Sequence, residues 1–236
     1  MSNSQTIEIQ STDGTGTFTA YVALPPSGKG PAVVICQEIF GVNATMREVA
    51  DGFAQEGFVA VVPDLFWRLE PGVQLDYTPD GWQKAFGFFN NFDQAVGTQD
   101  IAATLRDARA LPECQDYDKA GVVGYCLGGK MAYLAACRTD AAVSVGYYGT
   151  GIENKLEEMD NIQGQLVLHF AGNDEYCPPE AQAKIRAAAE GRANVAIYDY
   201  PGVQHAFSRP RGDHYDAAAD ALARERTLKA LRDALC

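Results

Sequence analysis

The sequence has little positive charge, few histidines and no long apolar run. Lysine and arginine number 19 against 31 acidic residues, which gives the 236-residue chain a net charge of −12. Because an acidic surface repels phosphate backbones and anionic membranes, we expect neither nucleic acid nor membrane as a partner. No apolar run approaches the roughly 18 residues of a membrane span, and the first ten residues lack a basic segment followed by an apolar one. These absences predict a cytoplasmic protein.

The six cysteines form no CxxC pair and show no spacing typical of a disulfide framework. In a reducing compartment we expect free thiols, most of them small buried hydrophobic residues. No metal-ligand spacing is present either, so we expect no metal and no organic cofactor. A catalytic role for any one of these thiols depends on its sequence context.

Short apolar runs alternate with longer amphipathic segments along the whole chain, which indicates an α/β protein. β-branched runs such as 32–36 (AVVIC) and 58–62 (FVAVV) are typical of strands buried on both faces of a parallel sheet. With no repeat and no linker, the pattern predicts one domain over residues 1–236, a mostly parallel central sheet with helices on both faces. Strands are expected at 6–10, 17–24 (an antiparallel edge strand that can pair with 6–10), 32–36, 58–62, 120–124, 142–147, 165–170 and 194–200. Helices are expected at 45–56, 100–110, after Cys126, after Pro178-Pro179 and at the C-terminus.

Residues 64–92 depart from this alternation because they are rich in proline, glycine and aromatic side chains and have weak periodicity. We expect an irregular excursion over the sheet, serving as a lid or as a pocket wall.

The segment with the clearest chemical signal is Gly124-Tyr125-Cys126-Leu127-Gly128-Gly129, between a β-branched strand and a helix. It matches the nucleophile elbow of α/β-hydrolases, G-x-S-x-G, with cysteine in the serine position. The turn places the sulfur at a helix N-terminus, which favours thiolate, and aims the Leu127 N–H at a developing oxyanion. The alternative interpretation is a glycine-rich turn with a buried thiol; a phosphate loop is excluded by the spacing.

In this fold the acid and then the histidine follow the nucleophile, each on a loop after a later strand. Asp174 follows strand 165–170 and His205 follows strand 194–200, so we expect an orienting carboxylate and a general base there. The alternatives are a turn-forming aspartate and an ordinary loop histidine. His169 lies within an expected strand as a core residue, and His214 is expected at the start of the C-terminal helix, at the surface.

A second component follows the first buried strand, in Gln37-Glu38-Ile39-Phe40-Gly41. The loop at this place normally gives the second oxyanion N–H, which we assign to Ile39. Glu38 is unusual because a carboxylate near a thiolate raises the pKa of the thiol. Its other interpretation is a solvated loop acid or a salt-bridge partner.

Several segments together resemble the dienelactone hydrolase (carboxymethylenebutenolidase) family. They spread over nearly the full length and are QEIFGVN (37–43), VVPDLF (61–66), VGYCLGG (123–129), VGYYG (145–149), HFAGNDEYCPP (169–179), YPGVQHAFSR (200–209) and ALARERTL (221–228). The resemblance implies opening of an unsaturated carboxymethyl lactone to maleylacetate by a Cys126–His205–Asp174 triad with Ile39 and Leu127 as oxyanion donors. It also implies a latent thiol bonded to Glu38, whose carboxylate shifts on substrate binding to take the proton.

The resemblance further implies that arginines hold the substrate carboxylate, and Arg209 matches one of them. The family's other arginine follows a PGxxLD stretch, here 71–76, but residues 77–84 read YTPDGWQK and contain none. Lys84 is the candidate replacement, without the bidentate geometry of arginine, and Trp82 the candidate lining of a more apolar pocket. Phe40 and Tyr148 complete the expected substrate-binding residues.

Three hypotheses follow. The first is a dienelactone-type hydrolase acting through a thioester, the second a related cysteine esterase for less anionic substrates, and the third a non-catalytic ligand-binding protein on the same fold. For the two enzymes we expect a small lactone or ester as the partner and a monomer or weak homo-oligomer.

Overall fold

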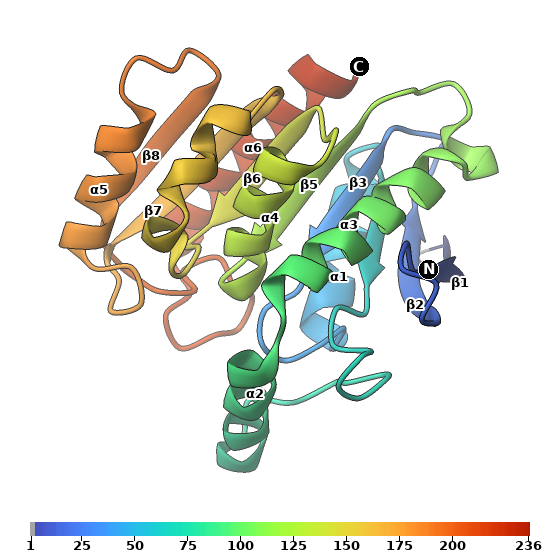
Figure 1. Cartoon of the computed structure of the whole chain (residues 1–236), viewed down its shortest axis with the longest axis horizontal. Coiled ribbons are helices and arrows are strands. Elements are labelled where there is room, and N and C mark those ends of the chain that lie inside the picture. The colour runs from blue at the N-terminus through green and yellow to red at the C-terminus, as the bar shows by residue number, and fades with distance from the viewer. Residues whose placement is uncertain (1–2) are drawn as a thin grey trace. The chain divides into compact units, whose positions relative to one another are not determined.

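The computed structural model describes residues 3–236 and divides into two compact units, one ending at Gly121 and the other spanning Val122–Cys236 (Figure 1). Met1 and Ser2 of the polar N-terminal segment lie outside the described residues. No helix within residues 3–236 is both long and apolar enough to cross a bilayer. One domain over residues 1–236 stays a prediction, and each unit is described by itself.

The first unit contains strands in the order β1-β2-β4-β3, namely β1 (Asn3–Gln10), β2 (Thr17–Leu24), β3 (Ala32–Cys36) and β4 (Val59–Pro63). β1, β2 and β4 pair antiparallel in succession, and β3 pairs parallel with β4. Every residue of β3 and β4 is buried, as their β-branched composition predicts. The expected antiparallel pairing of 17–24 with 6–10 is confirmed. Its expected place at the edge of the sheet is wrong, because β4 pairs with its other side.

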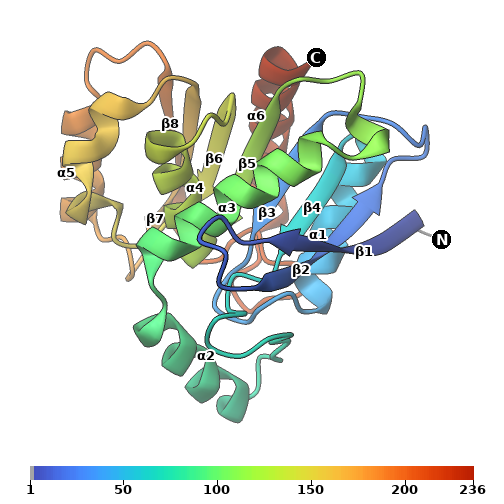
Figure 2. The same ribbon diagram turned by 45° about the vertical axis from the view of Figure 1, so that its right-hand side comes forward.

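Helices α1 (Ala44–Gln55) and α3 (Gln94–Arg109) cover the two faces of these strands (Figure 2). α1 begins where the Asn43 side chain accepts the N–H of Met46 and ends just before Gly57, whose φ of 99° suits glycine. α3 begins six residues before the predicted helix at 100–110. The cause is Asp93, whose side chain accepts the N–H groups of Ala95 and Val96.

The segment 64–92 was expected to be irregular, and its second half is instead the helix α2 (Pro79–Asn91). Thr78 caps it by accepting the N–H of Gly81, and Pro79 stands in the first turn, where a missing N–H costs nothing. The aromatic side chains of this helix have two sets of partners. Trp82 stacks near Phe86 at 5.7 Å between ring centroids, whereas Phe88 stacks on Phe66 at 5.2 Å. α2 projects beyond the ends of the strands (Figure 2).

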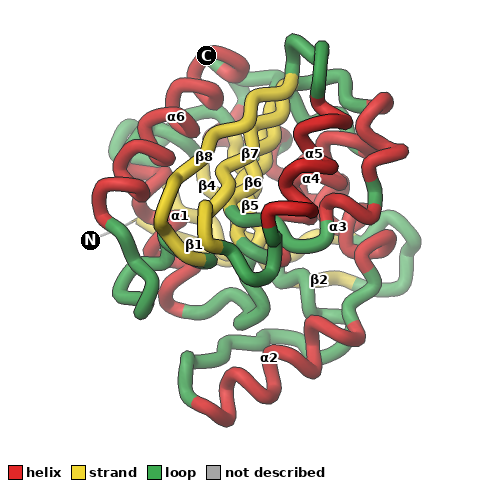
Figure 3. Tube along the Cα trace, turned by 90° about the vertical axis from the view of Figure 1, so that its left-hand side faces the viewer, coloured by secondary structure: helices red, strands yellow, loops and turns green. Residues whose placement is uncertain are grey.

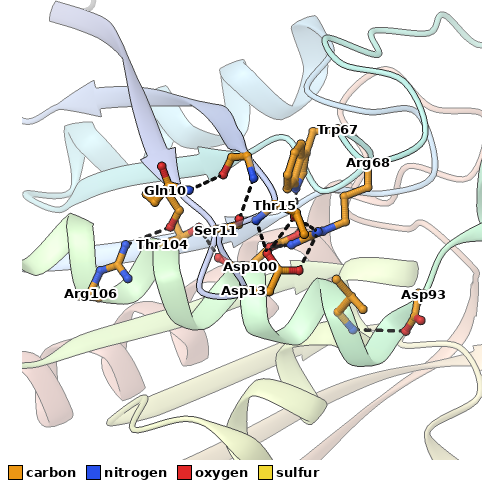
Figure 4. A network of polar contacts seen from close by, with 12 residues as sticks. Gln10, Ser11, Asp13, Thr15, Trp67, Arg68, Asp93, Asp100, Thr104 and Arg106 are labelled. Atoms are coloured by element: carbon orange, nitrogen blue, oxygen red, sulfur yellow. Dashed lines mark hydrogen bonds and ion pairs between the residues drawn. The ribbon is translucent and has the colours of Figure 1, made fainter.

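A buried ion pair anchors the beginning of this segment (Figure 4). Asp100 on α3 is fully buried and accepts two N–H groups of Arg68, at 3.0 and 2.8 Å, and the indole N–H of Trp67 at 2.8 Å. Arg68 also reaches Asp13 in the β1–β2 turn at 3.0 Å. The chain leaving β4 is thereby fixed to both α3 and the hairpin.

The second unit contains strands in the order β5-β6-β7-β8, and β5 begins at the boundary with the first unit. β6, β7 and β8 are parallel. Helix α6 covers one face, and α4 and α5 cover the other (Figure 3). The two connections η2 (Ile152–Asn154) and η3 (Leu156–Asn161) are short 3-10 helices. The bounds are β5 (Ala120–Tyr125), β6 (Val143–Tyr147), β7 (Gln165–Asn173), β8 (Val195–Gln204), α4 (Leu127–Arg138), α5 (Pro179–Ala189) and α6 (Ala217–Leu235).

The predicted strands and helices of this unit are confirmed with shifts at their ends. β8 continues four residues past its predicted end through Pro201-Gly202, so it stops immediately before His205. The expectation that His214 starts the C-terminal helix is wrong, because Asp216 caps that helix and Ala217 is its first residue. His214 is exposed, as expected.

Candidate active site

Cys126 lies on a sharp turn between β5 and α4. Its φ is 57°, an uncommon value for a residue with a side chain, and its N–H donates to the Tyr147 carbonyl at 3.0 Å. The glycines around it are required by space. A Cβ at Gly124 would lie 1.8 Å from the Gly128 carbonyl oxygen, and one at Gly129 would lie 2.5 Å from the carbonyl oxygen of Tyr147. The glycine pattern around the cysteine therefore reflects a close crossing of strand and helix.

The turn places the thiol at the N-terminus of α4. The Cys126 carbonyl accepts the N–H groups of Gly129 and Lys130, at 3.0 and 3.2 Å. The N–H of Leu127, the first helical residue, has no acceptor within the helix and points out of its end. An anionic sulfur or oxygen at this end is stabilised by the helix dipole.

Asp174 and His205 meet at the ends of β7 and β8. Nδ1 of His205 lies 3.0 Å from each carboxylate oxygen of Asp174. The carboxylate is itself fixed, because its Oδ1 accepts the N–H groups of Tyr176 and Cys177 at 2.9 and 3.2 Å. Such a carboxylate holds an imidazole in one orientation and one tautomer.

The second nitrogen of His205, Nε2, is buried and makes no hydrogen bond of ordinary geometry within residues 3–236. Burial disfavours the imidazolium, but the interactions with Cys126 and with the Asp174 carboxylate outweigh burial and raise the pKa of His205. The three side chains are nearly buried, with exposures of 9% for Cys126, 7% for His205 and 3% for Asp174. The ring is therefore positioned to exchange a proton with the thiol.

Two tyrosines contact the imidazole edge-on. Tyr148, a predicted site residue, lies 5.0 Å from the His205 ring centroid, and Tyr176 lies 4.8 Å from it. Sequence reasoning missed Tyr176, whose only signal is its place two residues after Asp174. Tyr176 is 44% exposed, so one side of the imidazole is covered by a residue that reaches solvent.

Arg209 follows His205 on the same loop and is half-buried. Burial and the charges of Glu175, Cys126 and Asp174 raise the pKa of Tyr176, whereas the Arg209 charge lowers it. Cys126 and Arg209 therefore act on the same phenol hydroxyl.

The remaining predicted site residues belong to the first unit. Glu38, Ile39 and Phe40 follow β3 and are buried, with exposures of 3%, 5% and 1%. The Phe40 ring lies 4.8 Å from Trp82, edge to face. Lys84 lies apart from this pair, on the face of α2 that lines a groove of about 590 Å³ with residues 69–75. Phe40 and Trp82 are thus brought together, and Lys84 is not brought to them.

Within residues 3–236 no group of three or more His, Cys, Asp and Glu side chains is arranged to hold a metal ion. All of the cysteines are free thiols, and Cys236 alone among them is exposed.

Comparisons with known proteins agree over nearly the whole chain. A chain of Azospirillum brasilense is 41% identical over 90% of this chain and 91% of its own. A protein of Cupriavidus pinatubonensis named carboxymethylenebutenolidase 1 is 37% identical over 95% of each chain, and the carboxymethylenebutenolidase of Pseudomonas putida is 38% identical over 94% of this chain and 93% of its own.

Solved structures share the fold. A dienelactone hydrolase-like promiscuous phosphotriesterase from metagenomic libraries superposes with a TM-score of 0.81 at 20% identity, covering 99% of each chain. The dienelactone hydrolase of Anabaena variabilis gives 0.71 at 16% identity, also over 99% of each chain. The mostly parallel α/β-hydrolase fold is thereby confirmed. The family model of the dienelactone hydrolase family matches residues 18–235, and the chain belongs to this family of hydrolases.

Proposed function

We propose that this enzyme opens small lactones or esters with Cys126 as the nucleophile, His205 as the general base and Asp174 as the orienting acid. The observation that carries the proposal is the way in which the two ring nitrogens of His205 are engaged. Its Nδ1 is held by Asp174 at 3.0 Å, no group other than the Cys126 side chain competes for its Nε2, and the interaction with Cys126 raises its pKa. A base held in this way can take the thiol proton and return it.

The reaction proceeds in two steps. The Cys126 thiolate attacks the ester carbonyl, and the oxyanion of the tetrahedral intermediate accepts the N–H of Leu127. Collapse expels the alcohol oxygen, which takes the proton from His205 and leaves a thioester. His205 then removes a proton from water, which attacks the thioester and releases the acid and the thiol. Ile39 remains part of the proposal as the second oxyanion donor. Glu38 remains part of it as the alternative to His205 as first acceptor of the thiol proton.

The names of relatives support a carboxymethyl-substituted lactone as substrate, because those from Cupriavidus and Pseudomonas are carboxymethylenebutenolidases. In this proposal Arg209 holds the substrate carboxylate. The absence of arginine from residues 77–84 favours the alternative of a less anionic ester.

Replacement of the nucleophile tests the chemistry. We expect Cys126→Ala to lose ester turnover by at least about a thousandfold, since triad members act as a unit. Cys236→Ala, which removes an exposed thiol at the far end of the chain, should match the unaltered enzyme. Mass spectrometry of the quenched unaltered enzyme should show an acyl group on Cys126. Turnover by Cys126→Ala at the original rate would refute the role of Cys126 as nucleophile. If the unaltered protein bound esters or lactones and turned none of them over, it would be a ligand-binding protein.

A substrate panel distinguishes the two enzyme hypotheses, a dienelactone-type hydrolase and an esterase for less anionic substrates. For the unaltered enzyme, a higher kcat/KM for dienelactone than for neutral p-nitrophenyl esters supports the carboxylated substrate, and the reverse order supports the less anionic one. Arg209→Met should raise KM for dienelactone by about tenfold to a hundredfold, because one charge-assisted contact contributes about 1.5–3 kcal/mol. Arg211→Met, which removes an exposed arginine of the same loop, is the control. An unchanged KM in Arg209→Met would remove Arg209 from the substrate site.

A further inference from the structure

A buried chain of side-chain hydrogen bonds crosses the second unit and ends on α6. The Tyr147 hydroxyl lies 2.6 Å from Oγ1 of Thr227, which lies 3.0 Å from Nε2 of His169. Nδ1 of His169 lies 2.8 Å from the Tyr200 hydroxyl, and this hydroxyl accepts an N–H of Arg226 at 3.2 Å. The four members other than Arg226 are at most 3% exposed. These five residues are called the Thr227 network below.

The direction of the hydrogen bonds in the Thr227 network follows from Arg226 at one end and from the charge state of His169. Arg226 can only donate, so the Tyr200 oxygen accepts and its own O–H is left for Nδ1 of His169. Burial, together with the nearby Arg226 charge, lowers the pKa of His169 to about 3, so the ring is neutral and carries one N–H. That N–H is at Nε2 and donates to Thr227. Both ring nitrogens of His169 and the hydroxyl of Tyr200 then have hydrogen-bond partners.

Two members of the network also support the catalytic turn through their backbones. The Tyr147 carbonyl accepts the N–H of Cys126 at 3.0 Å, and the His169 carbonyl accepts the N–H of Tyr148 at 2.8 Å. Cys126 and Tyr148 have φ values of 57° and 39°. Positive φ in residues with side chains costs free energy and persists only where the surroundings fix it. Tyr147 and His169 pair in the sheet, and their side-chain bonds to Thr227 tie both of them to α6. The network thereby supports the two carbonyls that hold the strained residues.

Thr227 joins segments that are far apart in the chain. It is 58 residues from His169 and 80 residues from Tyr147. The segments 145–149, 169–179 and 221–228 carry the family resemblance, yet the triad takes only Asp174 from them. The Thr227 network gives the other two segments a physical role.

We propose that Thr227 and His169 are positioning residues, which set the backbone of Cys126 and Tyr148 and so the approach of the sulfur to the His205 imidazole. This inference rests on the proposed cysteine chemistry and deepens it. Thr227 and His169 act through Tyr147 and Tyr148 and do not touch the reacting atoms. Loss of the network should lower the rate of acylation and leave substrate binding in place.

Thr227→Val tests the inference, because valine keeps the shape and removes the hydroxyl. We expect kcat to fall about tenfold, since sub-ångström misplacement of a nucleophile has costs of this order, while KM stays within about twofold. Thr227→Ser restores the hydroxyl and should return kcat to within about twofold of the unaltered enzyme. Tyr147→Phe opens the network at its other end and should repeat the effect if Thr227→Val does not fold.

A second readout does not depend on turnover. Iodoacetamide alkylation of Cys126, measured by mass spectrometry against the exposed Cys236 in the same molecule, reports the nucleophile directly. We expect Thr227→Val to change the alkylation rate of Cys126 severalfold and to shift the pH dependence of that rate. The alkylation rate of Cys236 should stay unchanged. Turnover by Cys126→Ala would defeat the proposed function, but the ratio of the two alkylation rates would still test the positioning.

Leu231→Val is the matched control, because Leu231 is a buried residue of α6 outside the network. Its destabilisation, measured by urea unfolding, should be similar to that of Thr227→Val, and its kcat and alkylation ratio should stay unchanged. The inference is overturned if Thr227→Val keeps both quantities of the unaltered enzyme. It is also overturned if Leu231→Val, at equal stability, loses as much kcat.

Discussion

At the scale of single residues, the Asp174 carboxylate has two duties that one substitution separates. It accepts two backbone N–H groups of its own loop and the Nδ1 proton of His205. An asparagine at this position can still accept the two backbone N–H groups, but it lacks the negative charge that helps to raise the pKa of His205. We therefore expect Asp174→Asn to fold normally and to lower kcat on the order of 10²- to 10⁴-fold.

The pH profile of kcat/KM checks this prediction. Because the carboxylate raises the pKa of His205, its loss should move the limb that reports the imidazole to lower pH. Asp160→Asn, in an exposed pair with Arg192, is the control for a lost surface charge. A full rate in Asp174→Asn would show that the imidazole needs no orienting charge.

A second residue, Lys130, is a buried lysine with 8% exposure. Burial lowers the pKa of Lys130, with Glu153 opposing and Lys155 and Arg138 adding to the effect. Since burial outweighs the attraction to Glu153, Lys130→Met should raise the free energy of unfolding by about 1 kcal/mol at neutral pH. Urea unfolding measures the change. Lys155→Met, at a more exposed amine on the same side of the unit, should leave stability within about 0.5 kcal/mol, and a destabilised Lys130→Met would contradict the prediction.

At the scale of elements, α3 depends on its buried Asp100 (Figure 4). Asp100→Ala leaves Arg68 and the Trp67 indole without their acceptor. Arg68 retains 24% side-chain exposure and the Asp13 contact, so we expect a loss of about 2–3 kcal/mol, less than for a fully buried pair. The exposed pair of Lys29 and Asp116 offers the control, because Lys29→Ala should cost about 0–0.5 kcal/mol. Tryptophan fluorescence during urea unfolding reports both, and equal losses would contradict the prediction.

The same elements show what sequence could predict. The β-branched runs and the glycines around Cys126 predict β3, β4 and the elbow, because burial on two faces and a close strand–helix crossing allow few other residues. α2 escaped prediction because Gly81, Gly87 and its aromatic and asparagine side chains have low helix propensity, so its composition favours a loop. The Thr78-Pro79 pair, an N-cap followed by a first-turn proline, was the available signal.

At the scale of the whole molecule, the contacts that sequence reasoning missed are those between distant segments. The order of strands placed Asp174 and His205 because each follows a strand end in a known sequence of elements. Nothing local to Thr227 indicates that its hydroxyl meets His169, 58 residues away, and Tyr176 contacts the imidazole only because the loop after β7 folds back. Sequence patterns specify which element a residue belongs to, whereas packing decides its partner.

The histidines make stability depend on pH in opposite directions. His169 has a folded pKa of about 3 and an unfolded value near 6.5. Between these values the unfolded chain binds the additional proton, so the contribution of His169 is complete above about pH 6.5 and is lost as pH falls, by up to about 1.4 kcal/mol per unit. His205 has a raised pKa, so its contribution is complete below about pH 6.5 and is lost as pH rises. Lys130, with a lowered pKa, opposes His205 in the alkaline range.

Variants separate these contributions. His169→Gln keeps hydrogen-bonding groups and cannot become charged, so its unfolding free energy should fall less steeply than that of the unaltered enzyme between about pH 6.5 and pH 4. His205→Asn should lack part of the decline above about pH 6.5 and match the unaltered slope on the acid side. Urea unfolding across this pH range measures both slopes. Parallel curves for His169→Gln and the unaltered enzyme on the acid side would mean that His169 takes up its proton in the folded state, which its closed set of partners, Tyr200 and Thr227, should prevent.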